Sequence, residues 1–589
     1  MSVLETTAKG GAFLIEDVTP ERVFTPEKLT DEHRLIAQTA AEFVSTEVMP
    51  VIEQLEQKDW ALARTLIQRC AALGLLGTDV PESFGGVELD KVSSIIVGDV
   101  VGRCASFATT FGAQTGLAIT PLLCFGTEDQ KQRYLPKLVS GDLIGAYALS
   151  ESGSGSDALG ARARATRQPD GSFVLNGEKM WITNGGFADV FIVFAKVDGE
   201  AFTAFIVERS FPGVSTGKEE HKLGLHGSST TPLILQDAKV PAANVLGEIG
   251  KGHKVAFNVL NYGRFKLAAM CSGGAKEAIG EATKYAVSRK QFGKSIATFG
   301  AIRHKLAEMV IRAYATEAAL YRTAGLIDDK LQGSHANEAV LASLEEFAIE
   351  ASMLKVASSE MLDFVLDENV QIHGGNGFVR DYPAERHFRD ARVNRIFEGT
   401  NEINRLLIPG MLARRAVKGS LPLIPAAMRL QDELLTPSAP EAGGDAPLDA
   451  ERRTIAALKK TALMVLGTAM QTYGEKLPDQ QEVLSLSSDI IMDVFLAESA
   501  LARAGQAGRG SADRAPSDVH VAAARVFVND AAGRVEIAAR SALAAMTEGD
   551  TLRTLLAALR RFLKPAPVNT VALRHVVADA AIERKGYPF

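Results

Sequence analysis

The stretch RIFEGTNEINR, residues 395–405, places one carboxylate, Glu398, after two large apolar residues and directly before a glycine. Gly399 permits a tight turn, and either Thr400 or Asn401 can cap a following helix, whose N-terminus attracts anions such as phosphate. A carboxylate held beside apolar bulk on a loop is how proteins build a general base with a raised pKa. The stretch therefore predicts a catalytic base at Glu398, with an ordinary loop acid before a capped helix as the alternative.

The composition excludes several classes of protein. The chain has 589 residues, 46% of them apolar, and a net charge of −7 at pH 7. That length allows about four domain-sized units, and the acidic balance gives no basic surface for nucleic acid. The four cysteines lack metal-ligand spacing, so we expect buried, reduced thiols and no metal site. There is no signal-like N-terminus and no apolar run long enough to span a bilayer, which predicts a cytoplasmic protein.

Hydrophobic periodicity divides the chain into helical, β and helical parts. Apolar residues recur every three or four positions from about residue 27, with Asp31 as the expected N-cap. From about residue 146, short β-branched and aromatic runs end in Asn176-Gly177, Asn184-Gly185 and Asp198-Gly199, which are hairpin signals. We expect an N-terminal arm (1–26), a helical domain (27–145), a β domain (146–251), a helical domain with the base (252–411), a linker (412–450) and a C-terminal helical domain (451–589).

Five other stretches accompany the first. They are YALSESGSGSD (147–157), KMWITNGG (179–186), SRKQFGKSI (288–296), QIHGGNGF (371–378) and RDYPAERHFRDAR (380–392). GSGSDA fits a dinucleotide-binding fingerprint, but that fingerprint needs a βαβ unit and β-hairpins follow instead. In this order the stretches resemble the acyl-CoA dehydrogenase family over roughly residues 30–410, and the C-terminal extension is most similar to its very-long-chain branch. The resemblance implies a mainly α fold with a central β domain, in α–β–α order, plus a helical C-terminal extension.

The same resemblance implies FAD as the cofactor. Residues at the flavin ring would be Tyr147, Leu149, Ser150, Trp181, Ile182 and Thr183, and residues reaching the FAD of a neighbouring subunit would be Arg289, Gln291, Phe292, Gln371, Gly374 and Gly375. Thr400 and Glu402 would start the helix that faces the diphosphate, Ser156 would contact FAD and acyl-CoA, and Asn261, Arg264 and Gly399 would contact the substrate. Trp181 has plain core packing as its alternative, and His373 receives no catalytic role.

The reaction implied by the resemblance is α,β-dehydrogenation of a fatty acyl-CoA to a trans-2-enoyl-CoA in β-oxidation. Glu398 would remove the Cα proton while a hydride leaves Cβ for the flavin. Some branches of the family carry the base at the position of Gly263, which cannot act as one. Electrons would pass to electron-transfer flavoprotein. An assembly or scaffold protein on the same fold and an acyl-CoA oxidase are the alternatives.

Three further expectations concern substrate length, assembly and location. Thr109, Gly112 and Ala113 are small at positions that close the acyl pocket in medium-chain members, which favours a long acyl chain. Cross-subunit FAD contacts imply a homodimer, with residues 451–589 covering the surface by which shorter members form tetramers. The stretch 411–430 mixes basic and apolar residues, so peripheral membrane contact is weighed there against simple packing.

Overall fold

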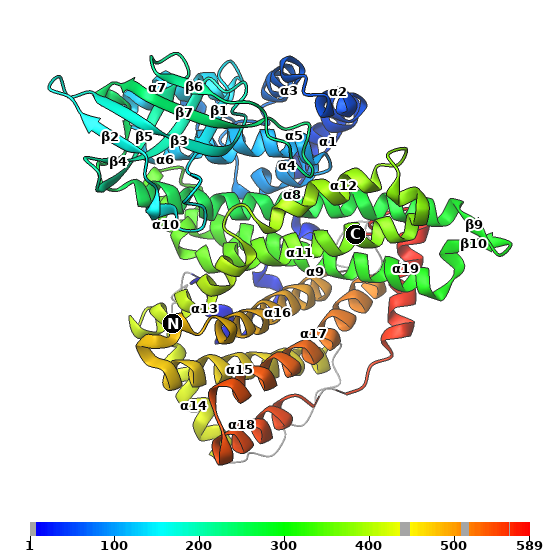
Figure 1. Ribbon diagram of the computed structural model, residues 1–589. Helices are drawn as coiled ribbons and strands as arrows, with labels where there is room; N and C mark the ends of the chain where they lie inside the picture. Colours follow the sequence, from blue (N-terminus) through cyan, green and yellow to red (C-terminus); the bar gives the residue numbers. More distant parts are fainter. Residues whose placement is uncertain (1–7, 436–447, 508–516, 565) are drawn as a thin grey trace.

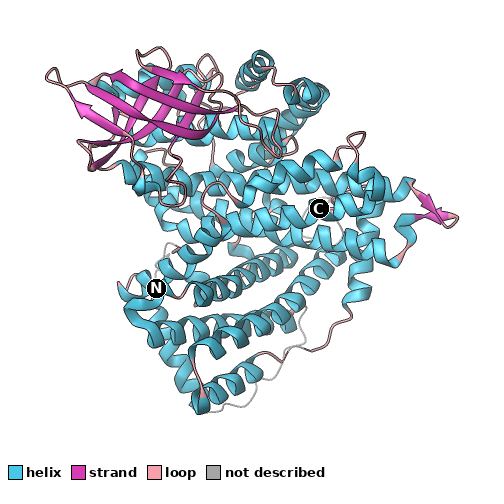
Figure 2. Ribbon diagram, in the orientation of Figure 1, coloured by secondary structure: helices cyan, strands magenta, loops and turns pink. Residues whose placement is uncertain are grey.

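The computed structural model describes residues 8–435, 448–507, 517–564 and 566–589. Figure 1 shows a β domain and N-terminal helices at one end, a layer of long helices in the middle and the C-terminal helices at the other end. Figure 2 shows that nearly all strands belong to the one β domain, and helices precede and follow it in the sequence. The expected α–β–α order with a helical C-terminal extension is confirmed.

The N-terminal part is helical. Its helices are α1 (Asp31–Phe43), α2 (Ile52–Glu56), α3 (Trp60–Ala72), α4 (Lys91–Val101), α5 (Ala105–Gly112), α6 (Thr120–Phe125) and α7 (Glu128–Val139). Thr30 rather than Asp31 caps α1, because the Thr30 hydroxyl accepts a hydrogen bond from His33 N at 3.2 Å and His33 Nδ1 accepts one from Thr30 N. A π-helical segment, Ala113–Ile119, joins α5 to α6, and such segments are common at functional sites.

The β domain is one sheet of eight strands. They are β1 (Gly145–Ala148), β2 (Arg164–Arg167), β3 (Phe173–Thr183), β4 (Val190–Val197), β5 (Ala201–Glu208), β6 (Val214–Thr216), β7 (Thr230–Val240) and β8 (Val245–Leu246). The order is β6-β7-β3-β2-β4-β5-β8, with β1 added parallel to β4. This path brings the ends of β1 and β3 beside the helical layers, where the site lies.

Only one of the three predicted hairpin signals closes a hairpin. Asp198-Gly199 joins β4 to β5, which pair antiparallel. Asn176-Gly177 lies inside β3, at a change of register against β7. Asn184-Gly185 ends β3, and the Asn184 side chain is fully buried, donating to Thr110 O and Gly145 O, both at 3.2 Å. Asn184 therefore links the end of β3 to α5 and β1 through its side chain. The neighbouring residues in the sequence do not indicate this role.

The middle layer is built on the longest helices. It contains α8 (Gly252–Ser288), the small hairpin β9 (Lys290–Gln291) and β10 (Lys294–Ser295), α9 (Gly300–Leu331), α10 (Asn337–Glu346), α11 (Ala348–His373), α12 (Ala384–Ala391) and α13 (Asn401–Val417). α11 packs along α8, and both pack on α9. The hairpin projects from the end of α8, at the edge of the molecule in Figure 1.

The C-terminal helices are α14 (Leu423–Leu435), α15 (Asp449–Tyr473), α16 (Gln481–Gln506), α17 (Ser517–Met546), α18 (Gly549–Phe562) and α19 (Thr570–Arg584). The predicted linker over 412–450 is wrong as far as residue 435, because α13 continues to Val417 and α14 follows. Pro422 and Pro425 stand before and within the first turn of α14, where proline is tolerated. The rest of that linker, 436–447, lies outside the described residues.

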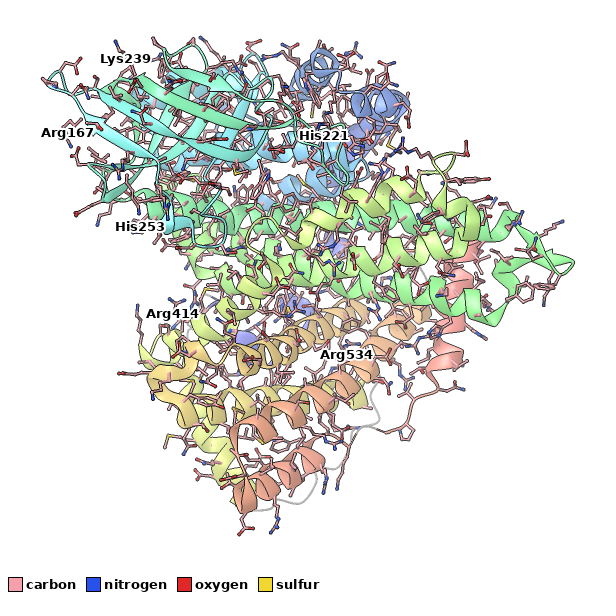
Figure 3. The ribbon with its side chains drawn as sticks, viewed as in Figure 1. Arg167, His221, Lys239, His253, Arg414 and Arg534 are labelled. Carbon is pink, nitrogen blue, oxygen red and sulfur yellow. The ribbon has the colours of Figure 1, made fainter. Side chains whose placement is uncertain are left out.

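The C-terminal helices share one hydrophobic core with α8, α9 and α11. Buried charges reinforce this contact: Arg503 of α16 is 1% exposed and bonds Glu317 of α9 at 2.6 Å and Glu27, in the short turn Pro26–Lys28 before α1, at 2.9 Å. Within the extension, Arg534 of α17, labelled in Figure 3, pairs with Asp493 of α16 at 2.6 Å. The extension is therefore built into the body of the molecule.

The stretch 411–430 favours packing over membrane contact. Leu412, Leu421 and Leu423 are buried, and Arg415 pairs with Glu346 at 2.6 Å. Arg414, labelled in Figure 3, stays exposed on α13. Across the described ranges, no helix is long and apolar enough to cross a bilayer. All four cysteines are buried and free, as expected.

Candidate active site

Glu398 lies in the short loop between α12 and α13 and has an unusual backbone conformation. Its φ is +57° and that of Gly399 is +78°, both in the left-handed region. A non-glycine residue there costs free energy, and such residues cluster at functional sites. Thr400 then caps α13, accepting a hydrogen bond from Ile403 N at 3.3 Å. The tight turn aims the Glu398 side chain back toward α8.

Two side chains hold this loop by its carbonyl groups. Arg264 of α8 is 6% exposed, and its Nε donates to Glu398 O at 3.0 Å. Asn404 of α13 donates to Gly399 O at 2.8 Å and to Thr400 O at 3.0 Å. Arg264 also donates to Asn261 Oδ1 at 3.0 Å. Arg264 therefore positions the loop, with Asn261 as its partner, and the predicted contact of both residues with the substrate stays a prediction.

The Glu398 carboxylate meets α8 at Gly263. A Cβ atom added to Gly263 would lie only 2.7 Å from Glu398 Oε2, so the carboxylate occupies the space that any side chain there would take. Glu398 Oε2 is buried and has no hydrogen-bond partner among the described residues. Burial raises the pKa of Glu398 to about 7, against the opposing effect of the positive charges on Arg264 and Lys355. A carboxylate in that state is suited to accept a proton near neutral pH.

Lys355 of α11 is a functional residue that no motif in the sequence singles out. It is fully buried, and its Nζ donates to Asn401 Oδ1 at 2.7 Å. Asn401 in turn donates to Ser359 Oγ and Glu360 Oε1, both at 3.0 Å. Burial lowers the pKa of Lys355 to about 8, so its ammonium is still largely charged at neutral pH. Asn401, the alternative cap, instead anchors the start of α13 to α11.

The carboxylate lines a mostly apolar cavity between α5, α8 and α11. Small residues form much of the wall: Gly102, Ala105, Ala108, Thr109, Gly112, Ala113, Gly116, Gly263 and Gly274. Thr109, Gly112 and Ala113 therefore lie where the sequence placed them, on the wall of the cavity that holds Glu398. The cavity follows α8 from Gly263 to Gly274, which is about 16 Å at 1.5 Å per residue.

Charged side chains that had no predicted role also line this wall, among them Arg103, Lys266 and Asp390. Lys266 lies one turn after Gly263 and is 5% exposed. It lines the cavity without a hydrogen bond to any described residue, and its stem passes Gly116. Burial lowers its pKa, with Asp79 opposing that effect and Lys91 adding to it.

The loop after β1 is braced by a buried ion pair. Lys179 is fully buried, with Nζ at 2.6 Å from Glu151 Oε1 and at 3.1 Å from Leu149 O. Tyr147 is close enough for the charge of Glu398 to raise its pKa, in addition to the larger effect of burial. Its hydroxyl is buried without a partner among the described residues. The ion pair thus fixes the segment that holds Ser150, and Tyr147 of the same segment lies near the Glu398 carboxylate.

Trp181, Ile182 and Thr183, the three flavin contacts predicted at the end of β3, lie in different environments. Trp181 has φ +58° and is 58% exposed, which excludes the alternative of plain core packing. It lies at a register shift between β3 and β7, and such bulges often re-aim a side chain at a site. Thr183 lines the cavity. Ile182 is 2% exposed in the core, so only its backbone can face a ligand.

Other predicted residues lie away from this cavity. Arg289, Gln291 and Phe292 are exposed at the hairpin that follows α8. Arg289 is 26 positions beyond Gly263, about 39 Å along the helix. Gln371, Gly374 and Gly375 are exposed at the end of α11. His373 nearby stacks on Tyr285 at 4.2 Å, which is a structural contact.

Ser156 and Glu402 are the remaining residues predicted to bind FAD or substrate, and both side chains are exposed. Ser156 is exposed on the loop after β1 and does not line the cavity with Glu398. Glu402 is exposed in the first turn of α13, where backbone and Thr400 hydrogen bonds lower its pKa. An ionised carboxylate there already satisfies the helix N-terminus, which disfavours Glu402 itself as a phosphate ligand. Within the described residues, no group of three or more His, Cys, Asp and Glu could hold a metal.

The fold and site combine an α–β–α architecture with a desolvated carboxylate on the wall of a mostly apolar cavity. Family models match the chain as acyl-CoA dehydrogenase N-terminal (30–142), middle (146–238) and C-terminal (250–412 and 457–561) domains. A probable acyl-CoA dehydrogenase of Bacillus subtilis is 46% identical over 98% of both chains. The protein belongs to the acyl-CoA dehydrogenase family and is an oxidoreductase.

A solved structure supports the same assignment over nearly the whole chain. It is an acyl-CoA dehydrogenase of Bacillus anthracis complexed with FAD, 46% identical, with a TM-score of 0.96 over 98% of this chain and all of that one. A very-long-chain-specific mitochondrial enzyme of Macaca fascicularis is 40% identical over 64% of this chain and 58% of its own. A human short-chain-specific enzyme is 38% identical over 67% and 92%. Sequence identity to these relatives therefore does not indicate the length of the acyl chain that this protein prefers.

Lys355→Met tests the electrostatics of the site. Removing a buried positive charge near Glu398 raises the pKa of that carboxyl further, so the deprotonated, active fraction is reached at higher pH. At a fixed pH below the pKa, raising the pKa by one unit lowers that fraction about tenfold. We expect the acid limb of the kcat–pH profile to move to higher pH. Ser359→Ala, which alters the same Asn401 contacts without a charge, should leave the limb in place. A Lys355→Met profile superimposable on the wild type would contradict this account.

Proposed function

We propose that this protein is an FAD-dependent dehydrogenase of long-chain fatty acyl-CoA, forming trans-2-enoyl-CoA in β-oxidation and passing electrons to electron-transfer flavoprotein. The observation that carries the proposal is Glu398: a buried carboxylate with a pKa of about 7 and a free oxygen, on the wall of an apolar cavity. The family relationship supplies the reaction class. The geometry supplies the base and the shape of the acyl site.

The chain's own residues provide the proton chemistry. The acyl tail lies in the cavity along α8, and its reacting end lies at Gly263, which leaves room for both the thioester and the carboxylate. Glu398 Oε2 takes the proton from Cα, and the electron pair of that C–H bond moves to form the Cα–Cβ double bond. The negative charge that develops on the thioester oxygen needs a donor, and the Glu398 backbone N–H is the candidate within this loop. Glu398 becomes neutral, which its buried setting favours.

The residues present fit FAD. When bound, FAD supplies the acceptor for the hydride that leaves Cβ. Tyr147, Ser150 and Thr183 would line the ring, since they border the site of Glu398, and the exposed Trp181 would pack on the flavin from β3. The capped N-terminus of α13 would face the diphosphate through backbone N–H groups. The orphaned Tyr147 hydroxyl is consistent with a polar ligand there.

Glu398→Gln is the direct test. The amide is nearly isosteric and keeps the loop contacts made by the backbone, but it cannot accept the α-proton. We expect a folded protein that still binds FAD, with the rate of flavin reduction by acyl-CoA lower by about 10²–10⁴-fold or more. The neighbouring Glu402→Gln should retain near-normal rates. A Glu398→Gln protein that reduces its flavin at the wild-type rate would refute the base assignment.

Small wall residues support a long acyl chain. The cavity is about 16 Å long, and each buried methylene contributes about 0.8 kcal/mol of binding. Ala113→Gln should fill the cavity partway and move the optimum of kcat/KM to shorter acyl-CoAs, with little loss for the shortest. Thr109→Ser, which keeps the volume small, serves as the control. If the wild type already works best on octanoyl-CoA or shorter chains, the long-chain assignment is wrong.

We infer a homodimer from the distance between groups of residues. Arg289, Gln291 and Phe292 are too far along α8 to serve the site of their own chain, yet they are exposed as ligand-binding residues would be. In a dimer, the hairpin of each chain would reach the site of the other chain. The C-terminal helices cover α9 and leave less surface for a tetramer. Light scattering of the FAD-loaded protein should give twice the chain mass of 62.9 kDa. A monomeric or tetrameric mass would count against this arrangement.

The electron acceptor distinguishes the proposed dehydrogenase from the alternative, an acyl-CoA oxidase. An oxidase on this fold would pass electrons to oxygen, so stoichiometric hydrogen peroxide during turnover would favour it. A scaffold role alone is disfavoured by the intact site at Glu398. Peripheral membrane contact at 411–430 stays a prediction: Leu412, Leu421, Leu423 and Leu430 are buried there, whereas Val417, Ile424 and Met428 are exposed.

A further inference from the structure

The far end of the acyl cavity meets a second cavity, and one residue lines both. The second cavity lies on the other side of the turn between α4 and α5, and it opens to the surface. Arg103, in that turn, borders the acyl cavity on one side and the second cavity on the other. Neither the family assignment nor the proposed chemistry gives Arg103 a role.

The turn is pressed against α8. The Gly102 backbone is so close that an added Cβ would lie 2.3 Å from Met270 O, and a Cβ added to Gly274 would lie 3.4 Å from Gly102 O. Gly274 also lines the acyl cavity. Arg103 therefore follows a glycine that packs directly against α8, next to Gly274 on the cavity wall.

Arg103 is free to move. It is half-buried, and its guanidinium makes no hydrogen bond or ion pair with any residue in the described ranges. Such groups are rarely left without partners in a stable interior. Glu277, one turn after Gly274 on α8, lines the second cavity and also makes no ion pair with a described residue. Displacing Arg103 would break no hydrogen bond or ion pair with a described residue, and Glu277 offers it a partner outside.

The second cavity has apolar side chains among charged ones. Leu29, Ala41, Ile96, Tyr321 and Phe589 are its apolar and aromatic lining residues. Charged residues line it as well: Asp99, Lys276, Glu277, Lys284, Arg584 and Lys585. Asp99 and Lys276 pair with each other at 3.0 Å, and a methylene chain can cover the apolar part of the wall.

The length of the acyl cavity determines when this exit is needed. An extended alkyl chain advances about 1.25 Å per carbon, given C–C bonds of about 1.5 Å, so about 16 Å holds roughly 13 carbons. A longer tail must coil, be rejected or leave at the far end.

We propose that Arg103 is a gate at the distal end of the acyl cavity, and that tails too long for the cavity displace it and emerge into the second cavity. The proposal rests on the acyl-CoA dehydrogenase function proposed above. It assigns Arg103 as a residue that sets the upper limit of tail length, and the second cavity as a binding site for the ends of saturated acyl chains.

The test compares eicosanoyl-CoA with dodecanoyl-CoA on the FAD-loaded enzyme. Arg103→Trp plugs the junction, so we expect kcat/KM for eicosanoyl-CoA to fall about tenfold or more while that for dodecanoyl-CoA stays within about twofold. Arg103→Ala opens the junction and should raise the eicosanoyl value. Glu277→Gln removes the outer partner and should lower the eicosanoyl value alone.

Chemical blocking gives an independent arm that leaves Arg103 in place. Gln38 is exposed and lines the second cavity. Because the native cysteines are buried, Gln38→Cys can be labelled selectively with a bulky maleimide. The label should depress turnover of eicosanoyl-CoA and not of dodecanoyl-CoA. The same label on Gln132→Cys, exposed on α7, should change neither.

The outcomes separate the two proposals. If the protein oxidises no acyl-CoA, the proposed function itself fails. If it oxidises dodecanoyl-CoA but rejects eicosanoyl-CoA, no tail emerges and the gate is wrong. The gate is also wrong if the ratio of kcat/KM for eicosanoyl-CoA to that for dodecanoyl-CoA is unchanged both in the Arg103 variants and after labelling. A gain specific to ω-carboxyl acyl-CoA, lost in Arg103→Ala, would show instead that Arg103 binds an anionic chain end.

Discussion

The structure depends on one constraint: a carboxylate must stay buried without an ion-pair partner at contact distance. Leaving a charge in such a setting is unfavourable, so the group responds by a raised pKa. The loop that holds it is also strained, with Glu398 at φ +57°. The surroundings must offset both costs. They do so through Arg264 and Asn404 on the loop carbonyls, the Thr400 cap on α13 and the packing of α11 along α8.

Helix α8 links this constraint to the rest of the molecule. Near one end it provides Gly263, whose missing side chain admits the carboxylate, and Arg264, which holds the loop. Further along, Leu267, Met270 and Gly274 form part of the cavity wall. At its far end the hairpin of β9 and β10 projects away from the body, as Figure 1 shows. The same helix thus sets the position of the Glu398 carboxylate, one wall of the cavity and the place of the projecting hairpin.

Local signals in the sequence predicted the parts that local chemistry decides. The residues around Glu398 indicated a base in an apolar setting and a helix cap at Thr400 or Asn401, and the change of period placed the β domain. Thr109, Gly112 and Ala113 were selected through the family resemblance. Contacts between distant elements could not be selected. Lys355 looks like any lysine in a helix, and only packing brings it beneath α13. Asn184 has the sequence of a turn but serves as a tie between layers. The linker was misplaced because its prolines fit the first turn of a helix.

Burial holds the pKa of the Glu398 carboxyl at about 7, so that this group can accept a proton near neutral pH. Infrared difference spectra of the FAD-loaded enzyme, taken across a pH titration with Glu398→Gln as the reference, would observe that carboxyl directly. We predict a protonated carboxyl band, absent from the variant, that disappears on deprotonation with a midpoint near 7. A midpoint near the ordinary value of 4.5, or no band that depends on Glu398, would contradict it.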